Sequence, residues 1–265
     1  MLFVKTRRFL LWNDLTVFFP SVKYLEGFAT RLRFDEIVRL SETAVDLSGY
    51  PNLFRRKLAL TTWLDLSRNL DTLYGAMDSK SCRYEIRRAG KMSDRISIMR
   101  NGGALDAFFD LYNKFVSQKG YADPLSRRRF KEFVKIADVF VASVDSRPVC
   151  GHLMVRDQEE GRVRLGFSAS LRLESKETAN VTGAVNRFLH WHEIQTYKSE
   201  GIRMYDFAGI EDGTTPIARF KLSFGGEQLV EHCYVFMGRG GQLAYRAYQK
   251  IPLLLNRSRR RSRIG

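Results

Sequence analysis

The feature that most constrains this chain is a strand-like run followed by a lysine between two aromatic residues and a glycine pair. Met204–Ile210 is apolar apart from Asp206, which we expect to end the strand. After a polar loop, Phe220–Glu227 reads Phe-Lys-Leu-Ser-Phe-Gly-Gly-Glu. Glycine tolerates a positive φ and lets a ligand or backbone come close, and a cation beside apolar walls acts more strongly than in bulk water. The pattern predicts a binding site. The alternative is a strand, a glycine-containing turn and a surface lysine with no ligand.

A second motif lies more than a hundred residues upstream, in Cys82–Lys91. Its composition predicts a helix. Arg83, Arg87 and Lys91 recur at intervals of four, which places three cations on one stripe, with Arg88 beside them. A stripe of charges is usually a solvated helix face, so the spacing alone does not assign a ligand.

Together the two motifs resemble those of the Fem-type aminoacyltransferases and of related acyltransferase domains in the GNAT superfamily. In these proteins an R-x-x-I-R-[RK]-A helix precedes the acyltransferase domain, and a YDFGG-like strand precedes F-K-x-x-F-G-G. The resemblance covers about residues 60 to 240, and it fails at Ala208, where a second glycine is common. It implies a GNAT (acyl-CoA N-acyltransferase-like) fold of the α+β class, with a mixed, mostly antiparallel central sheet flanked by helices.

The order of the expected elements agrees with such a fold. Apolar patterns predict helices over 105–116 and 130–137, strands over 139–144, 150–155 and 163–169, and a helix over 181–194. We expect residues 61–245 to form the GNAT-like domain. Residues 1–60 are expected to be strands and loops that form a reduced first GNAT-like half, and residues 246–265 a basic tail.

Composition limits the class of protein. With 265 residues, 44% of them hydrophobic, the chain can bury a substantial core. The net charge of +15 predicts a polyanion among the partners, such as a phosphate-rich cofactor, nucleic acid or an anionic membrane. Five arginines lie within Arg257–Arg263, beside three leucines. Contact with anionic lipid, contact with tRNA or other RNA, and a solubilising tail all stay open for this segment.

The chain shows no run of about 20 apolar residues and no secretory signal, so we expect a cytoplasmic protein that lies at the inner face of the membrane if its tail binds lipid. Cys82, Cys150 and Cys233 are odd in number and have no metal or redox spacing. We expect all three to be buried, reduced thiols.

The predicted helix over 181–194 opens with Asn-Val-Thr-Gly-Ala, in which Gly183 is the one glycine. In acyl-CoA-dependent GNAT enzymes the corresponding loop reads R/Q-x-x-G-x-G/A, and its amides hold the pyrophosphate at the helix N-terminus. No Arg or Gln occupies the matching position here. The resemblance therefore leaves an acyl-CoA held in another way, or an aminoacyl-tRNA, as the donor.

The resemblance also implies roles for single residues. The Phe-Lys pair of Fem-like enzymes lies at the reacting centre, so Lys221 would stabilise negative charge on the acyl carbonyl or donor and Phe220 would shape the pocket. Asp206 would orient the amine or bind a proton, although a strand-end carboxylate that caps a loop fits equally well. The residues expected to bind substrate or donor are Arg83, Arg87, Arg88, Gly183, Tyr205, Phe224, Gly225 and Gly226.

The histidines predict neither a metal site nor a catalytic triad. His190 and His192 are two residues apart on a helix and point to different sides, and His152 and His232 lie in strand-like segments. Cys150 precedes His152 by two residues, but alternation in a strand predicts a buried thiol and not a nucleophile. We expect no metal and no covalent catalysis.

These expectations combine in an N-acyltransferase. It would move an acyl or aminoacyl group from acyl-CoA or aminoacyl-tRNA to an amino group of a cell-envelope precursor, as in peptidoglycan biogenesis, or of a polysaccharide amino sugar. The alternative is a non-catalytic basic protein that keeps the GNAT scaffold and binds an anionic membrane or RNA; it would bind salt-dependently without turnover. The acyl group, the acceptor and the general base do not follow from the sequence.

Overall fold

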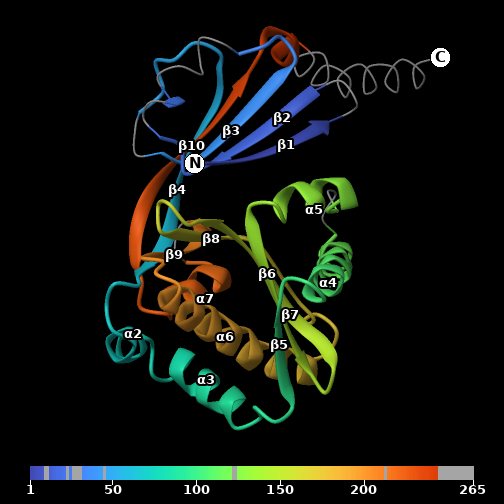
Figure 1. Ribbon diagram of the computed structural model, residues 1–265, viewed down its shortest axis with the longest axis vertical. Coiled ribbons are helices and arrows are strands. Elements are labelled where there is room, and N and C mark those ends of the chain that lie inside the picture. Colours follow the sequence, from blue (N-terminus) through green and yellow to red (C-terminus); the bar gives the residue numbers. More distant parts are fainter. Residues whose placement is uncertain are drawn as a thin grey trace, which may run out of the picture. The chain divides into compact units, whose positions relative to one another are not determined.

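The computed structural model describes residues 1–8, 12–21, 24–25, 32–43, 46–120, 124–211 and 214–243 (Figure 1). The predicted basic tail, with Arg257–Arg263, lies outside the described residues. Among those described, no helix is long and apolar enough to cross a membrane.

The described strands form one mixed sheet in the order β1-β2-β3-β10-β4-β9-β8-β7-β6-β5. The strands are β1 (Leu2–Arg8), β2 (Trp12–Phe18), β3 (Glu36–Thr43), β4 (Leu53–Asp65), β5 (Ile96–Arg100), β6 (Ala137–Val144), β7 (Arg147–Asp157), β8 (Arg162–Ser170), β9 (Met204–Glu211) and β10 (Glu227–Met237). The labelled helices are α2 (Leu70–Ala76), α3 (Cys82–Gly90), α4 (Ala104–Gln118), α5 (Arg127–Phe133), α6 (Lys176–Ser199) and α7 (Pro216–Leu222). The predicted α+β architecture, a mixed and mostly antiparallel sheet flanked by helices, is confirmed.

The described residues divide into two compact units, one made of those in Met1–Leu58 together with those from Glu231 onward, and the other of those in Ala59–Val230. In the first unit β1 pairs with β2 antiparallel, β2 with β3 parallel and β3 with β10 antiparallel. Tyr234 is buried there, and its hydroxyl accepts a hydrogen bond from the Leu47 amide at 3.0 Å. The assignment of residues 1–60 as a reduced first GNAT-like half stays a prediction.

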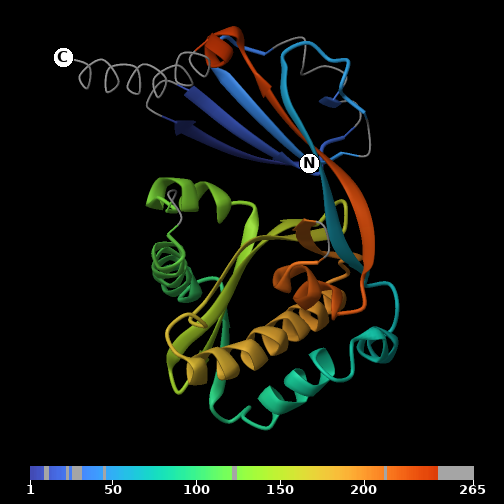
Figure 2. The ribbon, with the colours of Figure 1, turned by 180° about the vertical axis from the view of Figure 1, so that it is seen from behind.

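In the second unit, β5, β6, β7 and β8 form an antiparallel meander, and β8 pairs in parallel with β9. Helices α4 and α6 both pack on β6, β7 and β8, and Figures 1 and 2 show them on opposite faces of these strands, with α3 alongside α6. Because both faces are covered, Val149–Val155 of β7 is buried without alternation.

The helix expected over 130–137 lies earlier in the chain than predicted. Helix α5 spans Arg127–Phe133 because the Ser126 side chain caps its N-terminus, and Ala137 already begins β6. The aromatic spacing had correctly located the buried face, since Phe130 and Phe133 are both in the core.

The parallel contact between β8 and β9 is short. It joins Arg162–Arg164 to Met204–Asp206 in three residue pairs. Beyond this contact, β8 continues against β7 as far as Ser170, while β9 pairs with β4 on its other side. The two strands therefore have separate partners from about Asp206 onward.

Asp206 is the third residue of β9 and does not end it, so that expectation is wrong. The strand continues because a register shift against β4 accommodates Phe207 and Ala208, between the Asp206↔Trp63 and Gly209↔Thr61 pairs. Ala208 has a φ of 60°. This is the position where the family pattern has glycine, and the backbone conformation is one that glycine adopts without the steric cost of a Cβ.

We expect Ala208→Gly to raise the free energy of unfolding by about 0.5–1 kcal/mol, because relief of the left-handed strain exceeds the entropy lost by glycine on folding. Urea denaturation followed by circular dichroism measures the change. The matched control is Ala179→Gly within α6, which should lower stability by about 1 kcal/mol. An equal loss in both variants would show that Ala208 is unstrained.

Candidate active site

Lys221 is positioned by helix α7, whose N-terminus is defined by a capping side chain and a proline. The Thr215 side chain caps the helix by accepting a hydrogen bond from the Ala218 amide at 3.1 Å, and Pro216 occupies the first turn. In the last turn, Lys221 Nζ donates hydrogen bonds to the carbonyl oxygens of Gly209 at 2.8 Å and Ala208 at 3.3 Å. The irregular part of β9 thus holds the ammonium group where β8 and β9 have separate partners.

The Phe220 ring packs between the Arg187 guanidinium and the buried rings of His190 and Phe224. The guanidinium of Arg187, from α6, stacks over its ring at 4.6 Å from the centroid. On the core side, the ring centroid of His190 lies 5.7 Å from that of Phe220 and 5.3 Å from that of Phe224. Phe224 is fully buried, while Phe220 is half-buried. The predicted Phe-Lys pair therefore joins the surface of α6 to the aromatic core.

The glycine pair packs against the chain itself. A Cβ on Gly225 would lie 2.3 Å from the carbonyl oxygen of Ala76, and one on Gly226 would lie 2.6 Å from that of Trp63. Gly225 also has a φ of 75°. Packing against the end of α2 and against β4 therefore requires both glycines, and a ligand-binding role for them stays a prediction.

Asp206 is buried and hydrogen-bonded within the chain. Its carboxylate accepts from the Thr61 hydroxyl at 2.5 Å and from Arg164 at 2.8 Å. It also accepts from the Ala208 amide at 2.7 Å, across the bulge. These bonds join β4, β8 and β9. A direct role towards an amine stays a prediction for Asp206.

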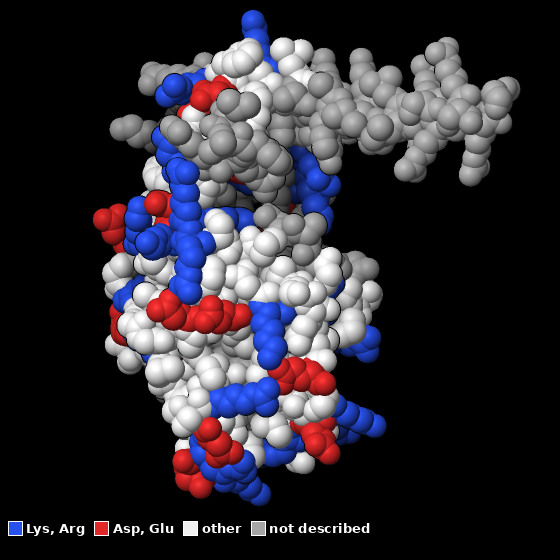
Figure 3. All heavy atoms as spheres, turned by 90° about the vertical axis from the view of Figure 1, so that its right-hand side faces the viewer, with Lys and Arg blue, Asp and Glu red and all other residues white. Residues whose placement is uncertain are grey.

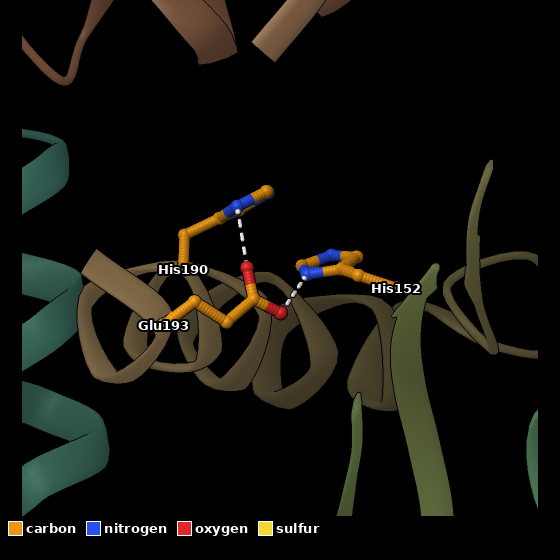
Figure 4. A group of neighbouring side chains, drawn as sticks. All are labelled: His152, His190 and Glu193. Atoms are coloured by element: carbon orange, nitrogen blue, oxygen red, sulfur yellow. Dashed lines mark hydrogen bonds and ion pairs between the residues drawn. The ribbon is translucent and has the colours of Figure 1, made fainter. Parts of the chain in front are cut away.

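A buried polar network lies beneath this region (Figure 4). Glu193 Oε1 is 2.7 Å from His152 Nδ1, and Glu193 Oε2 accepts from the Tyr205 hydroxyl at 2.5 Å. That hydroxyl is also 2.7 Å from His190 Nδ1, and the two imidazole rings stack at 4.0 Å. All four side chains are fully or almost fully buried. Tyr205, predicted to bind substrate or donor, is thus a core residue.

Two of the four histidines meet in the structure, a contact that the sequence did not predict. His152 comes from β7 and His190 from α6, and the sheet packing brings them together. Glu193 follows His190 by three residues, so both face the same side of the helix, and this spacing was the signal available in the sequence.

Ionisation of the network follows from burial and charge. Burial opposes the ionised form of Glu193, but the charge and hydrogen bond of His152 outweigh it and hold the pKa of Glu193 at about 2. Burial lowers the pKa of His190 to about 3, and the charges of His152 and Lys221 act in the same direction. His190 is therefore neutral at physiological pH.

The ligand atoms of His152, His190 and Glu193 lie within 4.8 Å of one another, close enough for a metal ion to be considered. They are already hydrogen-bonded: His152 Nε2 lies 2.9 Å from Asn186 Oδ1, and Tyr205 bridges His190 and Glu193. A hydrogen-bonded core network accounts for the arrangement without an ion. The absence of a metal cofactor stays a prediction.

The predicted arginine helix packs along α6. Arg88 donates a hydrogen bond to the Asn180 carbonyl of α6 and pairs with Glu85 at 3.0 Å. Arg87 is exposed. Arg83 is partly buried, and its Nε has no hydrogen-bond partner among the described residues. Sequence reasoning missed Arg187, which lies on α6 close to these residues.

Gly183 was expected in a loop that opens the helix, but it lies inside α6. Helix α6 begins at Lys176, because the Ser175 side chain accepts a hydrogen bond from the Thr178 amide at 3.1 Å. Gly183 is therefore inside the helix, where its amide is not at the N-terminus and a Cβ would meet open space. Its amide therefore does not form an anion site at the helix N-terminus, and a donor-binding role for Gly183 stays a prediction.

The thiols agree with expectation at two positions. Cys82 and Cys150 are buried, and Cys233 is only partly so. Burial raises the pKa of Cys82 to about 11 and also raises that of Cys150. Both thiols are therefore protonated near neutral pH, and the prediction that Cys150 is a buried thiol is confirmed.

Comparison with known proteins identifies the family of this chain. Residues 78–222 match the model of the acetyltransferase (GNAT) domain family. This chain belongs to that family. It is an acyltransferase with the GNAT fold, as the motifs predicted. A search of curated proteins gave no match.

Solved structures with the same fold include FemX, with a TM-score of 0.61 and 11% identity over 92% of this chain and 85% of FemX. The C-terminal DUF2156 domain of a proposed lysylphosphatidylglycerol synthetase from Agrobacterium fabrum gives a TM-score of 0.56 and 11% identity, covering 90% of this chain and 82% of that one. L-PGS from Bacillus licheniformis gives 0.50 and 12%, covering 85% and 78%. At these identities the likeness shows the fold alone.

We expect the free energy of unfolding to fall as the pH is lowered from 7 to 5. The folded pKa of His190 lies below the ordinary value of 6.5, so the unfolded chain binds a proton that the folded protein does not. The stability from neutral His190 is present above pH 6.5 and is lost below it, by at most about 1.4 kcal/mol per pH unit. Urea denaturation at several pH values measures the slope.

His190→Phe should reduce this slope. His192→Gln serves as the comparison. Burial also lowers the pKa of His192, so the contribution of His192 to the pH slope must be measured separately. A slope unchanged by His190→Phe would show that His190 titrates normally in the folded protein.

Proposed function

We propose that this acyltransferase moves an acyl or aminoacyl group to an amino group, with Lys221 at the reacting centre. The observation that carries the proposal is the position of Lys221 Nζ, bound to two carbonyls of β9 beyond the last residue pair with β8. A cation fixed in this way undergoes little reorganisation when charge develops on a substrate oxygen.

The chemistry follows from these groups. A neutral amine attacks the acyl carbonyl, a C–N bond forms, and the C–S bond of a thioester or the C–O bond of an aminoacyl ester breaks. The Lys221 ammonium stabilises the negative oxygen of the tetrahedral intermediate, and Phe220 limits the position of the acyl group. The amine proton leaves with the thiol or hydroxyl group that is released.

Two donors are compatible with this scheme. The helical position of Gly183 removes one way of holding coenzyme A, while arginines along α3 and α6 offer another. An aminoacyl-tRNA would suit the net charge of +15. For the acceptor, the motifs similar to Fem-type enzymes and the likeness of fold to FemX and L-PGS support an amine of a cell-envelope precursor; a polysaccharide amino sugar is the second candidate.

We expect Lys221→Met to reduce transfer at least about 100-fold, because one charged donor to the developing oxyanion is removed. The measurement is transfer of labelled acyl or aminoacyl groups from acetyl-CoA or aminoacyl-tRNA to a panel of amines. Arg219→Met is the matched control, since Arg219 is exposed on the same helix and should keep full activity. Equal activity in the two variants, with unchanged thermal unfolding, would remove Lys221 from the reacting centre.

The donor class is tested by thermal stabilisation of the purified protein. A shift with acetyl-CoA that persists in salt identifies an acyl-CoA enzyme, and a shift with aminoacyl-tRNA alone identifies aminoacyl transfer. No shift with either donor, together with no turnover, would contradict the proposal in favour of a non-catalytic binding protein.

A further inference from the structure

The buried polar network contains two imidazole rings and one carboxylate. His152 and His190 stack with their ring centroids 4.0 Å apart, and Glu193 lies beside both of them. All three side chains are at most 1% exposed. Two imidazolium rings at this separation would repel each other strongly in surroundings of low dielectric, and one carboxylate balances one positive charge. The carboxylate therefore stabilises a cation on one of the two rings only.

The geometry selects His152 as the charged ring. Its Nδ1 lies 2.7 Å from Glu193 Oε1, and its Nε2 lies 2.9 Å from Asn186 Oδ1. Both ring nitrogens face oxygen atoms that accept hydrogen bonds, and only the imidazolium form of histidine donates from both. Burial raises the pKa of Glu193, and the positive charge of His152 is the largest influence that lowers it, to about 2.

His190 is held in the neutral form with its proton on Nδ1. The Tyr205 hydroxyl donates its hydrogen to Glu193 Oε2 at 2.5 Å, so the hydroxyl oxygen accepts one from His190 Nδ1 at 2.7 Å. Glu193 Oε2 lies farther from His190 Nδ1, at 3.4 Å. Tyr205 thus comes between this ring and the carboxylate, whereas His152 meets the carboxylate directly.

The charge of His190 bears on the reacting centre because the ring contacts α7. Its centroid lies 5.7 Å from that of Phe220, which precedes Lys221 in the helix. Burial lowers the pKa of His190 to about 3, and the charges of His152 and Lys221 act in the same direction. Repulsion between two cations is mutual, so a positive His190 would push the Lys221 ammonium away from the carbonyls of β9.

These charges differ from those at the surface. On the face drawn in Figure 3, basic and acidic side chains are interspersed in contact with water, which screens them. The groups around His190 lie in the interior, apart from the partly buried Lys221. They come from four elements: Glu193 on α6, His152 on β7, Tyr205 on β9 and Lys221 on α7. A proton moved among them therefore acts at nearly full strength on its neighbours.

We propose that His152 is a positioning residue for acyl transfer: it takes the one positive charge that Glu193 balances and so keeps His190 neutral. With His190 neutral, no second cation lies beneath Lys221. Asn186 assists, because its carbonyl oxygen accepts the second imidazolium proton of His152. The inference rests on the proposed function, because it concerns the lysine placed at the reacting centre.

The charge of each ring is measured by NMR of the imidazole nitrogens in the full chain, which has four histidines. We expect His152 to be an imidazolium at neutral pH and His190 to be neutral, with its proton on Nδ1. In His152→Gln, Glu193 loses its direct cation, and His190 should then take up a proton near neutral pH. A neutral His152 in the wild type, or an unchanged His190 in the variant, would overturn the inference.

Transfer rates show whether this charge matters to the reaction. The rate of His152→Gln, divided by that of the wild type at the same pH, should fall at least about tenfold between pH 8 and pH 5, because His190 gains a proton. The ratio removes the effect of protonating the substrate amine. His232→Gln is the matched control, since His232 belongs to the other unit, and it should match the wild type at each pH. A ratio lowered equally at all pH values would reduce His152 to a packing role and overturn the proposal.

Asn186 supplies a second pair of variants, because it is only partly buried and can be changed without opening the core. Asn186→Leu removes the acceptor at His152 Nε2, so His152 should lose its charge and the transfer ratio should fall at low pH as in His152→Gln. Asn186→Asp should keep His152 charged. Thermal unfolding confirms that each variant is folded. The same charge on His152 in both variants would contradict the argument from its two acceptors.

Lys221→Met separates this inference from the proposed function, because NMR reads the rings without any transfer. An imidazolium at His152 together with full transfer in Lys221→Met would overturn the role of Lys221 and leave the charge assignment standing. A neutral His152 together with lost transfer in Lys221→Met would overturn this inference alone.

Discussion

A single buried carboxylate, that of Asp206, joins three strands at the point where β8 and β9 cease to pair. It accepts hydrogen bonds from Thr61 on β4, Arg164 on β8 and the Ala208 amide on its own strand. With Arg164 7% and Asp206 1% exposed, this is a buried ion pair whose rupture would leave an uncompensated charge in the core. The positions of the β9 bulge and of the carbonyls that bind Lys221 both depend on it.

The neutral His190 packs beneath helix α7 and β9. Its ring contacts Phe207, Phe220 and Phe224, and its Nδ1 meets the Tyr205 hydroxyl. Glu193 fixes this hydroxyl and also His152 from β7. Helix α7 therefore rests on a set of side chains whose orientations are set by hydrogen bonds as well as by packing, which favours a lysine held in one position.

Much of the fold followed from local patterns. The β-branched runs located β6, β7 and β8, and the apolar periodicity located α4 and the buried face of α6, because these elements are long and packed on both sides. Lys221, Phe220 and the α3 arginines were identified from motifs. The His152–His190–Glu193 network and the place of Arg187 were not. The spacing of His190 and Glu193 is local, but the contact of α6 with His152 on β7 and with Phe220 on α7 joins segments far apart in the sequence, which no local pattern encodes. The start of α6 was misplaced because the cap at Ser175 precedes the apolar stripe by six residues.

The glycine pair has a consequence for how specificity could change in this enzyme. Gly225 and Gly226 press against the backbone of α2 and β4, so the end of α7 has no room to shift on that side. A change of side chain cannot relax these backbone contacts. The wall of the site formed by α2 and β4 therefore cannot be reshaped by substitution. The wall on the α6 side includes the Arg187 side chain over Phe220, which can be exchanged singly while the lysine stays in place. Selection for a new substrate, natural or in the laboratory, would act on that wall.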